Sequence, residues 1–112
     1  VEFNNLWGIQ RMAKEKQFEN KIKRFLDEND CWYVKYFANN YTKRGIPDIL
    51  ACVNGYFVAI EVKAENGVPS ELQKYHVNKI KSAGGIALIL YPKDFEYFKN
   101  LVYELKEDEY EE

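Results

Sequence analysis

The chain has 112 residues, of which 46% are hydrophobic and 30% charged, and a formal net charge of −2. This length predicts a single domain with one core, and the lack of a long apolar run excludes a membrane-spanning helix. The charge is uneven: residues 104–112 hold six acids and one lysine, a net of −5, so residues 1–103 carry +3. We expect an acidic tail after a mildly basic body.

Residues 1–13 show no clean periodicity, so we expect an irregular arm. Residues 14–29 predict a helix, because Phe18, Ile22, Phe25 and Leu26 recur at helical spacing. Glu19 lies at the edge of this apolar stripe and should face the interior or a cleft, with a border salt bridge to a lysine four residues on as the alternative. Six basic residues crowd between positions 11 and 24, either as a solvated helix face or as a surface for a phosphate backbone. They are Arg11, Lys14, Lys16, Lys21, Lys23 and Arg24.

Residues 31–37 are aromatic and branched with alternating polarity, which predicts a strand, and residues 38–45 predict a loop. Lys43 and Arg44 in this loop are suited to contacting phosphates. The two cysteines, Cys31 and Cys52, have no zinc or redox spacing. We expect both to be reduced and structural, with Cys52 in a buried strand, and this favours a cytoplasmic protein. An intrachain disulfide is the alternative.

A hairpin is predicted around Asn54-Gly55, which separates two apolar runs and suits a two-residue type I′ turn. That turn fixes the register of the two strands and places Asp48 opposite Glu61. Lys63 should point to the same sheet face, because alternate residues of a strand share a face. Both faces of the hairpin are otherwise apolar, so these charges interrupt a buried pattern. They predict a divalent-metal hydrolysis site, with a structural ion-pair cluster as the alternative.

A helix is predicted from Ser70 to about residue 83, since Ser70 and Gln73 form a capping-box pair and two glycines follow at 84 and 85. Residues 86–91 predict a buried strand, and Asp94 can cap a last helix. The order helix, strand, strand, strand, helix, strand, helix predicts an α/β fold. We expect three layers, with a central mixed β-sheet flanked by helices.

The motifs together resemble the PD-(D/E)XK nuclease superfamily and, more narrowly, the VRR-NUC domain, the virus-type replication and repair nuclease module. They are R-G-I-P-D at 44–48, I-E-V-K at 60–63, Gly67, S-x-x-Q at 70–73, and Gly84-Gly85, with Glu19 in the first helix. The likeness covers about residues 15–91. It implies a restriction-endonuclease-like fold in a single VRR-NUC-like domain over 1–112, with a core of about 15–103 and the acidic tail 104–112.

The resemblance also implies roles for individual residues. Asp48 and Glu61, with the Val62 backbone carbonyl, would ligate Mg²⁺ or Mn²⁺, and Lys63 would orient the attacking water. Glu19 would act around the ligands or on a second ion. Gln73 would hold Lys63 or the water, with its capping role as the alternative. The residues expected to bind DNA, on weaker grounds, are Lys21, Lys23, Arg24, Lys43 and Arg44.

The function implied is that of a metal-dependent DNA endonuclease, structure-selective and similar to Holliday junction resolvases, which acts as a homodimer in DNA repair. Its partner is branched DNA, with neither a membrane nor a small-molecule substrate, and its origin is a phage or a bacterium. One alternative is a non-catalytic nucleic-acid-binding or assembly module. Another is a nuclease for flaps or branched DNA that works with a partner protein.

Overall fold

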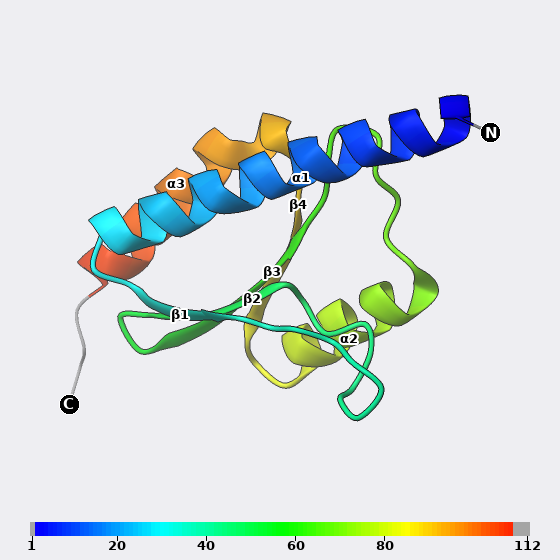
Figure 1. Ribbon diagram of the computed structural model, residues 1–112. Coiled ribbons are helices and arrows are strands. Elements are labelled where there is room, and N and C mark those ends of the chain that lie inside the picture. Colours follow the sequence, from blue (N-terminus) through cyan, green and yellow to red (C-terminus); the bar gives the residue numbers. More distant parts are fainter. Residues whose placement is uncertain (1, 109–112) are drawn as a thin grey trace.

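The computed structural model describes residues 2–108, with side chains from residue 6 onward. A four-stranded sheet of order β1-β2-β3-β4 lies between helices, with α1 and α3 on one face and α2 on the other (Figure 1). The first three strands are antiparallel and β4 is parallel to β3, so the sheet is mixed as predicted. The elements are α1 (Glu2–Glu28), β1 (Trp32–Lys35), β2 (Ile49–Val53), β3 (Tyr56–Val62), α2 (Glu71–Ser82), β4 (Ile86–Leu90), the 3₁₀ turn η1 (Pro92–Asp94) and α3 (Phe95–Glu107).

The main core lies between the sheet and the helix pair α1 and α3. It contains the predicted helical stripe of α1 and every second residue of the hairpin strands, which accounts for their apolar pattern. A smaller core packs α2 onto the opposite face through Ala59, Val77 and Ala87. The buried residues of the main core are Phe18, Ile22, Phe25, Leu26, Ile49, Ala51, Val53, Val58, Ile60, Val62, Leu90, Phe98 and Val102.

The hairpin has the predicted register. Asn54 and Gly55 both have positive φ, 49° and 86°, as a two-residue type I′ turn requires. Ile49 pairs with Ile60, so Asp48 is one step beyond the last paired residue of β2, at the level of Glu61. The turn chemistry therefore sets both carboxylates at one end of the same strand pair.

The connection from β3 to β4 begins with the predicted capping box. The backbone N–H of Gln73 donates to Ser70 Oγ at 3.1 Å, and the Ser70 N–H donates to Gln73 Oε1 at 2.8 Å. These bonds satisfy two of the free N–H groups at the start of α2. The helix then crosses the sheet face and returns the chain as β4.

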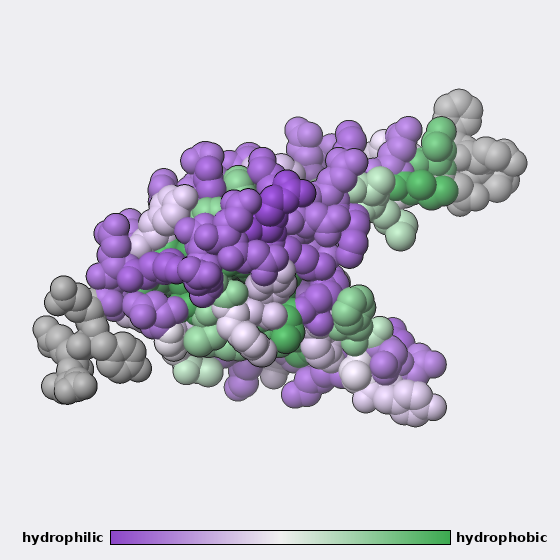
Figure 2. All heavy atoms as spheres, turned by 60° about the vertical axis from the view of Figure 1, so that its left-hand side comes forward, coloured by the Kyte–Doolittle hydropathy of each residue, from purple (hydrophilic) through white to green (hydrophobic). Residues whose placement is uncertain are grey.

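The prediction of an irregular N-terminal arm is wrong, because α1 begins at Glu2. Its first turns project beyond the sheet, and hydrophobic side chains lie on this projection (Figures 1 and 2). Leu6, Trp7, Ile9 and Met12 are 55–71% exposed. Where no sheet lies underneath, burial imposes no apolar period, so a helix there carries no periodic signal. Residue 1 lies outside the described residues.

Cys52 is exposed rather than buried, which corrects the prediction for its strand. The helix α2 packs against β3 and β4 but leaves part of the same sheet face open, where Trp32 and Phe57 are 64% and 46% exposed. Both cysteines are free in the structure. The first strand is also shorter than predicted and ends at Lys35.

The last helix runs to Glu107, so the first four residues of the predicted acidic tail are helical, and residues 109–112 lie outside the described part. Asp94 does not cap this helix with its side chain, because its Oδ2 accepts a hydrogen bond from the Tyr91 N–H at 3.2 Å. None of the described helices is both long and apolar enough to cross a bilayer.

Candidate active site

The predicted acids and lysine meet at the end of the hairpin opposite its turn. Asp48 directly precedes β2, Glu61 is the penultimate residue of β3, and Lys63 follows that strand. Glu19 of α1 approaches the same end of the sheet, and Lys35 at the end of β1 connects it to Asp48. The site is therefore built on rigid elements rather than on long loops.

Asp48 is held by the backbone of the neighbouring strand. Its Oδ2 accepts a hydrogen bond from the Val62 N–H at 2.8 Å, and its Oδ1 lies 3.3 Å from Lys35 Nζ. The approach to Asp48 is shaped by buried Pro47 and by Gly45, whose φ of +76° disfavours other residues. One carboxylate oxygen is thus fixed by the sheet while the other faces a cation.

Glu61 is 1% exposed, a costly position for a carboxylate. Its Oε2 lies 3.5 Å from Lys63 Nζ, whereas its Oε1 is buried and has no hydrogen-bond partner among the described residues. Burial raises the pKa of Glu61 to about 8, the negative charge of Asp48 adds to the rise, and Lys63 opposes it. A buried acid with an unpartnered oxygen beside a second acid is the arrangement expected where a cation binds.

Glu19 lies among three lysines. Its Oε1 is 2.5 Å from Lys35 Nζ, and its Oε2 is 2.9 Å from the Nζ atoms of both Lys16 and Lys23. Burial acts to raise the pKa of Glu19, but the hydrogen bonds from the lysines outweigh it and lower the pKa to about 2. The prediction that Glu19 faces inward is confirmed, and so is its salt bridge with Lys23.

The donor set of the site fits a hard divalent cation, which takes oxygen ligands and retains several waters. Among residues 6–108, no group of three or more His, Cys, Asp or Glu side chains is arranged to hold a metal ion. Two carboxylates, Asp48 and Glu61, are available, and one of them presents the unpartnered Oε1. The remaining ligands would have to be a backbone carbonyl, water and the substrate phosphate.

A family model for the archaeal Holliday junction resolvase (Hjc) matches residues 10–110. The chain belongs to this family. Members of the family are metal-dependent endonucleases of the PD-(D/E)XK superfamily that resolve four-way DNA junctions. No curated protein and no solved structure matches the chain. The expected superfamily, fold and resolvase activity are thereby confirmed at the level of the family.

Two residues of this candidate site were not predicted from the sequence. Lys35 bonds both Glu19 and Asp48, and these bonds raise its pKa although burial acts to lower it. Glu15 lies one turn before Glu19 on α1 and is half-buried. Burial, and then the charges of Asp48 and Glu19, raise the pKa of Glu15. The charges of Lys63 and Lys35 oppose this rise. Lys35 could have been found as the lone charge in an aromatic strand, but no tight turn fixed its register.

Gln73 is engaged in its capping role, through its Oε1 and the Ser70 N–H. No hydrogen bond between Gln73 and Lys63 or Glu61 occurs in the described part of the chain, so the role of Gln73 in the site stays a prediction. Of the residues predicted to bind DNA, Lys43 and Arg44 are exposed in the loop before Asp48. Lys23 is occupied by Glu19, and Lys21 Nζ lies 4.5 Å from the ring centroid of Phe95.

Proposed function

We propose that the protein cuts four-way DNA junctions as a homodimer with Mg²⁺ or Mn²⁺, using Asp48 and Glu61 as metal ligands. The observation that carries this proposal is the buried Glu61 Oε1, which has no hydrogen-bond partner among the described residues and belongs to an acid beside Asp48. An unpartnered buried carboxylate is unfavourable unless a proton or a cation neutralises it. The family match supplies the substrate, since its members act on Holliday junctions.

The ligands would be Asp48, Glu61 and the Val62 backbone carbonyl, completed by water and a DNA phosphate. A bound Mg²⁺ or Mn²⁺ would lower the pKa of its water and offset the negative charge that grows on the phosphate. The Val62 N–H holds Asp48 Oδ2 at 2.8 Å, so the backbone fixes one carboxylate before any cation arrives. This pre-organisation reduces what must be ordered on binding.

Lys63 is suited to orient the attacking water, because its ammonium lies 3.5 Å from Glu61 Oε2 on the proposed ligand. A positive group there would also stabilise the charged transition state. Glu19 would act indirectly, by holding Lys35 against Asp48, and Gln73 would assist from the start of α2. These assignments follow the VRR-NUC pattern, which we propose as the finer likeness of this site.

DNA would approach over the loop at 38–45 and the basic part of α1. Lys43 and Arg44 are exposed next to the chain segment that leads into Asp48, and Lys21 and Arg24 are exposed on α1. Lysine and arginine contacts to phosphates position a nuclease without reading sequence. Such contacts agree with selection by DNA shape rather than by base sequence.

Resolving a junction requires two cuts, and a chain with one site supplies them as a two-fold dimer. The uncovered part of the sheet supports such an interface. Trp32 is the register partner of Cys52, and Cys52 of Phe57, so three exposed residues form one apolar row across the sheet. An exposed apolar row suits a second copy of the chain better than it suits DNA.

A cleavage assay tests the proposal on a four-way junction, a flap and a matched duplex, with Mg²⁺, Mn²⁺ or EDTA. We expect paired nicks on the junction with either metal, and a loss of at least 100-fold for Asp48→Asn and Glu61→Gln with junction binding retained. Failure of the wild type to cut any DNA with metal present would contradict it and favour a binding module. Cutting of flaps alone would favour the branched-DNA alternative.

The predicted cytoplasmic setting is supported by the two free cysteines, and the phage or bacterial origin stays a prediction.

A further inference from the structure

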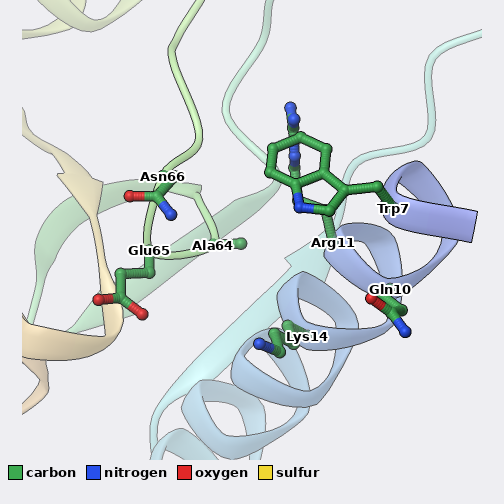
Figure 3. A pocket seen from close by; sticks show the side chains of 7 residues that line it. All are labelled: Trp7, Gln10, Arg11, Lys14, Ala64, Glu65 and Asn66. Atoms are coloured by element: carbon green, nitrogen blue, oxygen red, sulfur yellow. The ribbon is translucent and has the colours of Figure 1, made fainter. Parts of the chain in front are cut away.

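A pocket lies beside the proposed metal site, between the projecting turns of α1 and the loop that follows β3 (Figure 3). Both walls are continuous with the site, since Lys14 directly precedes Glu15 on α1 and Ala64 directly follows Lys63. The pocket has a volume of about 100 Å³. That is room for a phosphate group or the edge of one base rather than for a duplex. The residues that line this Trp7 pocket are Trp7, Gln10, Arg11, Lys14, Ala64, Glu65 and Asn66.

The aromatic and basic side chains share the helix face that packs the core. Trp7, Arg11, Lys14, Phe18 and Ile22 follow one another at steps of four, three, four and four residues, so they form one stripe along α1. Phe18 and Ile22 are buried against the sheet. Because α1 continues past the edge of the sheet, the part of this stripe that holds Trp7, Arg11 and Lys14 lies beyond the end of the sheet that carries the candidate site.

These side chains contact each other but leave surface exposed for a ligand. The guanidinium carbon of Arg11 lies 4.0 Å from the ring centroid of Trp7, and the indole is still 55% exposed. Neither Arg11 nor Lys14 forms an ion pair among the described residues. Across the pocket Asn66 presents a side-chain amide and Glu65 a carboxylate (Figure 3). An open aromatic surface with unneutralised cations is how proteins hold unpaired nucleotides.

We propose that the Trp7 pocket holds the edge of one unpaired base at the branch point, a few nucleotides from the cut, with the exposed part of the indole stacked on that base and Arg11 and Lys14 on the neighbouring phosphates. This proposal rests on the proposed junction-cleaving function. Bases of a duplex already stack on each other, whereas the branch point leaves base faces open, so Trp7 favours branched DNA over duplex. The family match begins at residue 10, so Trp7 lies outside it.

Binding measurements in EDTA separate the two kinds of contact without cleavage. We expect Trp7→Ala to weaken binding of a four-way junction about tenfold and to leave binding of a matched duplex unchanged. Trp7→Phe should retain binding to within about threefold, because phenylalanine keeps a stacking surface. Arg11→Ala and Lys14→Ala should each lower the slope of log K against log salt by about 0.9 on the junction.

Met12→Ala is the matched control, since Met12 is 71% exposed on the same helix and does not line the pocket. A junction with 2-aminopurine at the branch gives a direct readout: its fluorescence should be quenched by the wild type and recover with Trp7→Ala. Equal losses on junction and duplex, or a Trp7→Ala protein that binds like Met12→Ala, would overturn the stacking. Unchanged salt slopes would overturn the phosphate contacts. A wild type that binds junctions but cuts none would instead refute the proposed nuclease function, and the pocket would still be tested.

Discussion

Asp48 and Glu61 lie at the same level of the hairpin, but only Asp48 has a backbone hydrogen bond to its carboxylate. Asp48 Oδ2 accepts a backbone hydrogen bond at 2.8 Å, whereas Glu61 Oε1 is buried without a partner in the described chain. The charge of Asp48 therefore acts on a neighbour that has little to neutralise it, apart from Lys63 at 3.5 Å. The pair is thus electrostatically unfavourable once Glu61 loses its proton, unless a cation binds.

The first prediction concerns pH and the metal-free protein. Burial and Asp48 raise the pKa of Glu61 to about 8, above its ordinary value of 4.5. Between these values the folded protein holds a proton that the unfolded chain has released, so the free energy of unfolding falls as the pH rises from about 4.5 to 8. The fall contributed by this group is at most about 1.4 kcal/mol per pH unit.

Urea unfolding in EDTA at pH 5.5 and pH 8 measures this effect. We expect Glu61→Gln to flatten the dependence on pH and to be more stable than the wild type at pH 8. Added Mg²⁺ should raise the melting temperature of the wild type at pH 8 and have little effect on the variant, because the cation replaces the proton. Equal pH slopes for both proteins would contradict this.

The second prediction concerns Lys35, which joins Glu19 at 2.5 Å to Asp48 at 3.3 Å. We expect Lys35→Met to lower the free energy of unfolding by about 1–2 kcal/mol at pH 7, because the buried Glu19 and the partly buried Asp48 lose a hydrogen-bond donor. Lys74→Met is the control, since Lys74 pairs with Glu71 on the surface at 3.2 Å and should contribute about 0–0.5 kcal/mol. Similar losses in both variants would show that the cluster has no special strength.

The third prediction concerns the glycine ahead of Asp48. A Cβ at Gly45 would lie 2.6 Å from Leu72 Cγ, and its φ is +76°. Gly84 also has a positive φ, +97°, but a Cβ there would meet no atom within 4 Å. We expect Gly45→Ala to destabilise by about 2–3 kcal/mol and Gly84→Ala by about 1 kcal/mol in denaturant unfolding. Only Gly45→Ala should also slow junction cleavage, because it shifts the backbone segment that leads into Asp48. Equal effects on stability and on cleavage would contradict it.

The fourth prediction concerns the homodimer. Trp32→Glu places a charge in the apolar row on the open sheet face, and Tyr97→Glu places one at a similarly exposed site on α3; the two residues are 64% and 63% exposed. We expect sedimentation to show that Trp32→Glu is monomeric and that Tyr97→Glu remains a dimer. The reverse outcome would place the interface on the last helix.

The hairpin and its charges were predictable because one local turn sets the pairing. Asn54 and Gly55 have the positive φ that their residue types favour, and the register follows by counting. Lys35 was not predictable in the same way, since the loop between β1 and β2 has no fixed turn geometry. Its contacts with Glu19 and Asp48 depend on how a distant helix and strand meet.

Other differences have equally simple physical origins. The first turns of α1 have no apolar period because the sheet does not extend beneath them, so their sequence does not predict a helix. Cys52 lies in an apolar strand, but exposure depends on where α2 ends, and that position is set by tertiary packing. Periodicity indicates which face of an element is apolar and does not indicate how much of that face a neighbour covers.

The long helix α1 carries both Glu19 of the site and Trp7 of the pocket, and so it fixes the distance between them. The two residues are twelve positions apart, which at about 1.5 Å per residue separates them by about 18 Å along the axis. A single DNA strand following this axis would advance about five nucleotides over the same length, at about 3.4 Å each. The distance between the cut and the held nucleotide is then a property of helix length, and lengthening or shortening α1 by whole turns would move the cut along the strand.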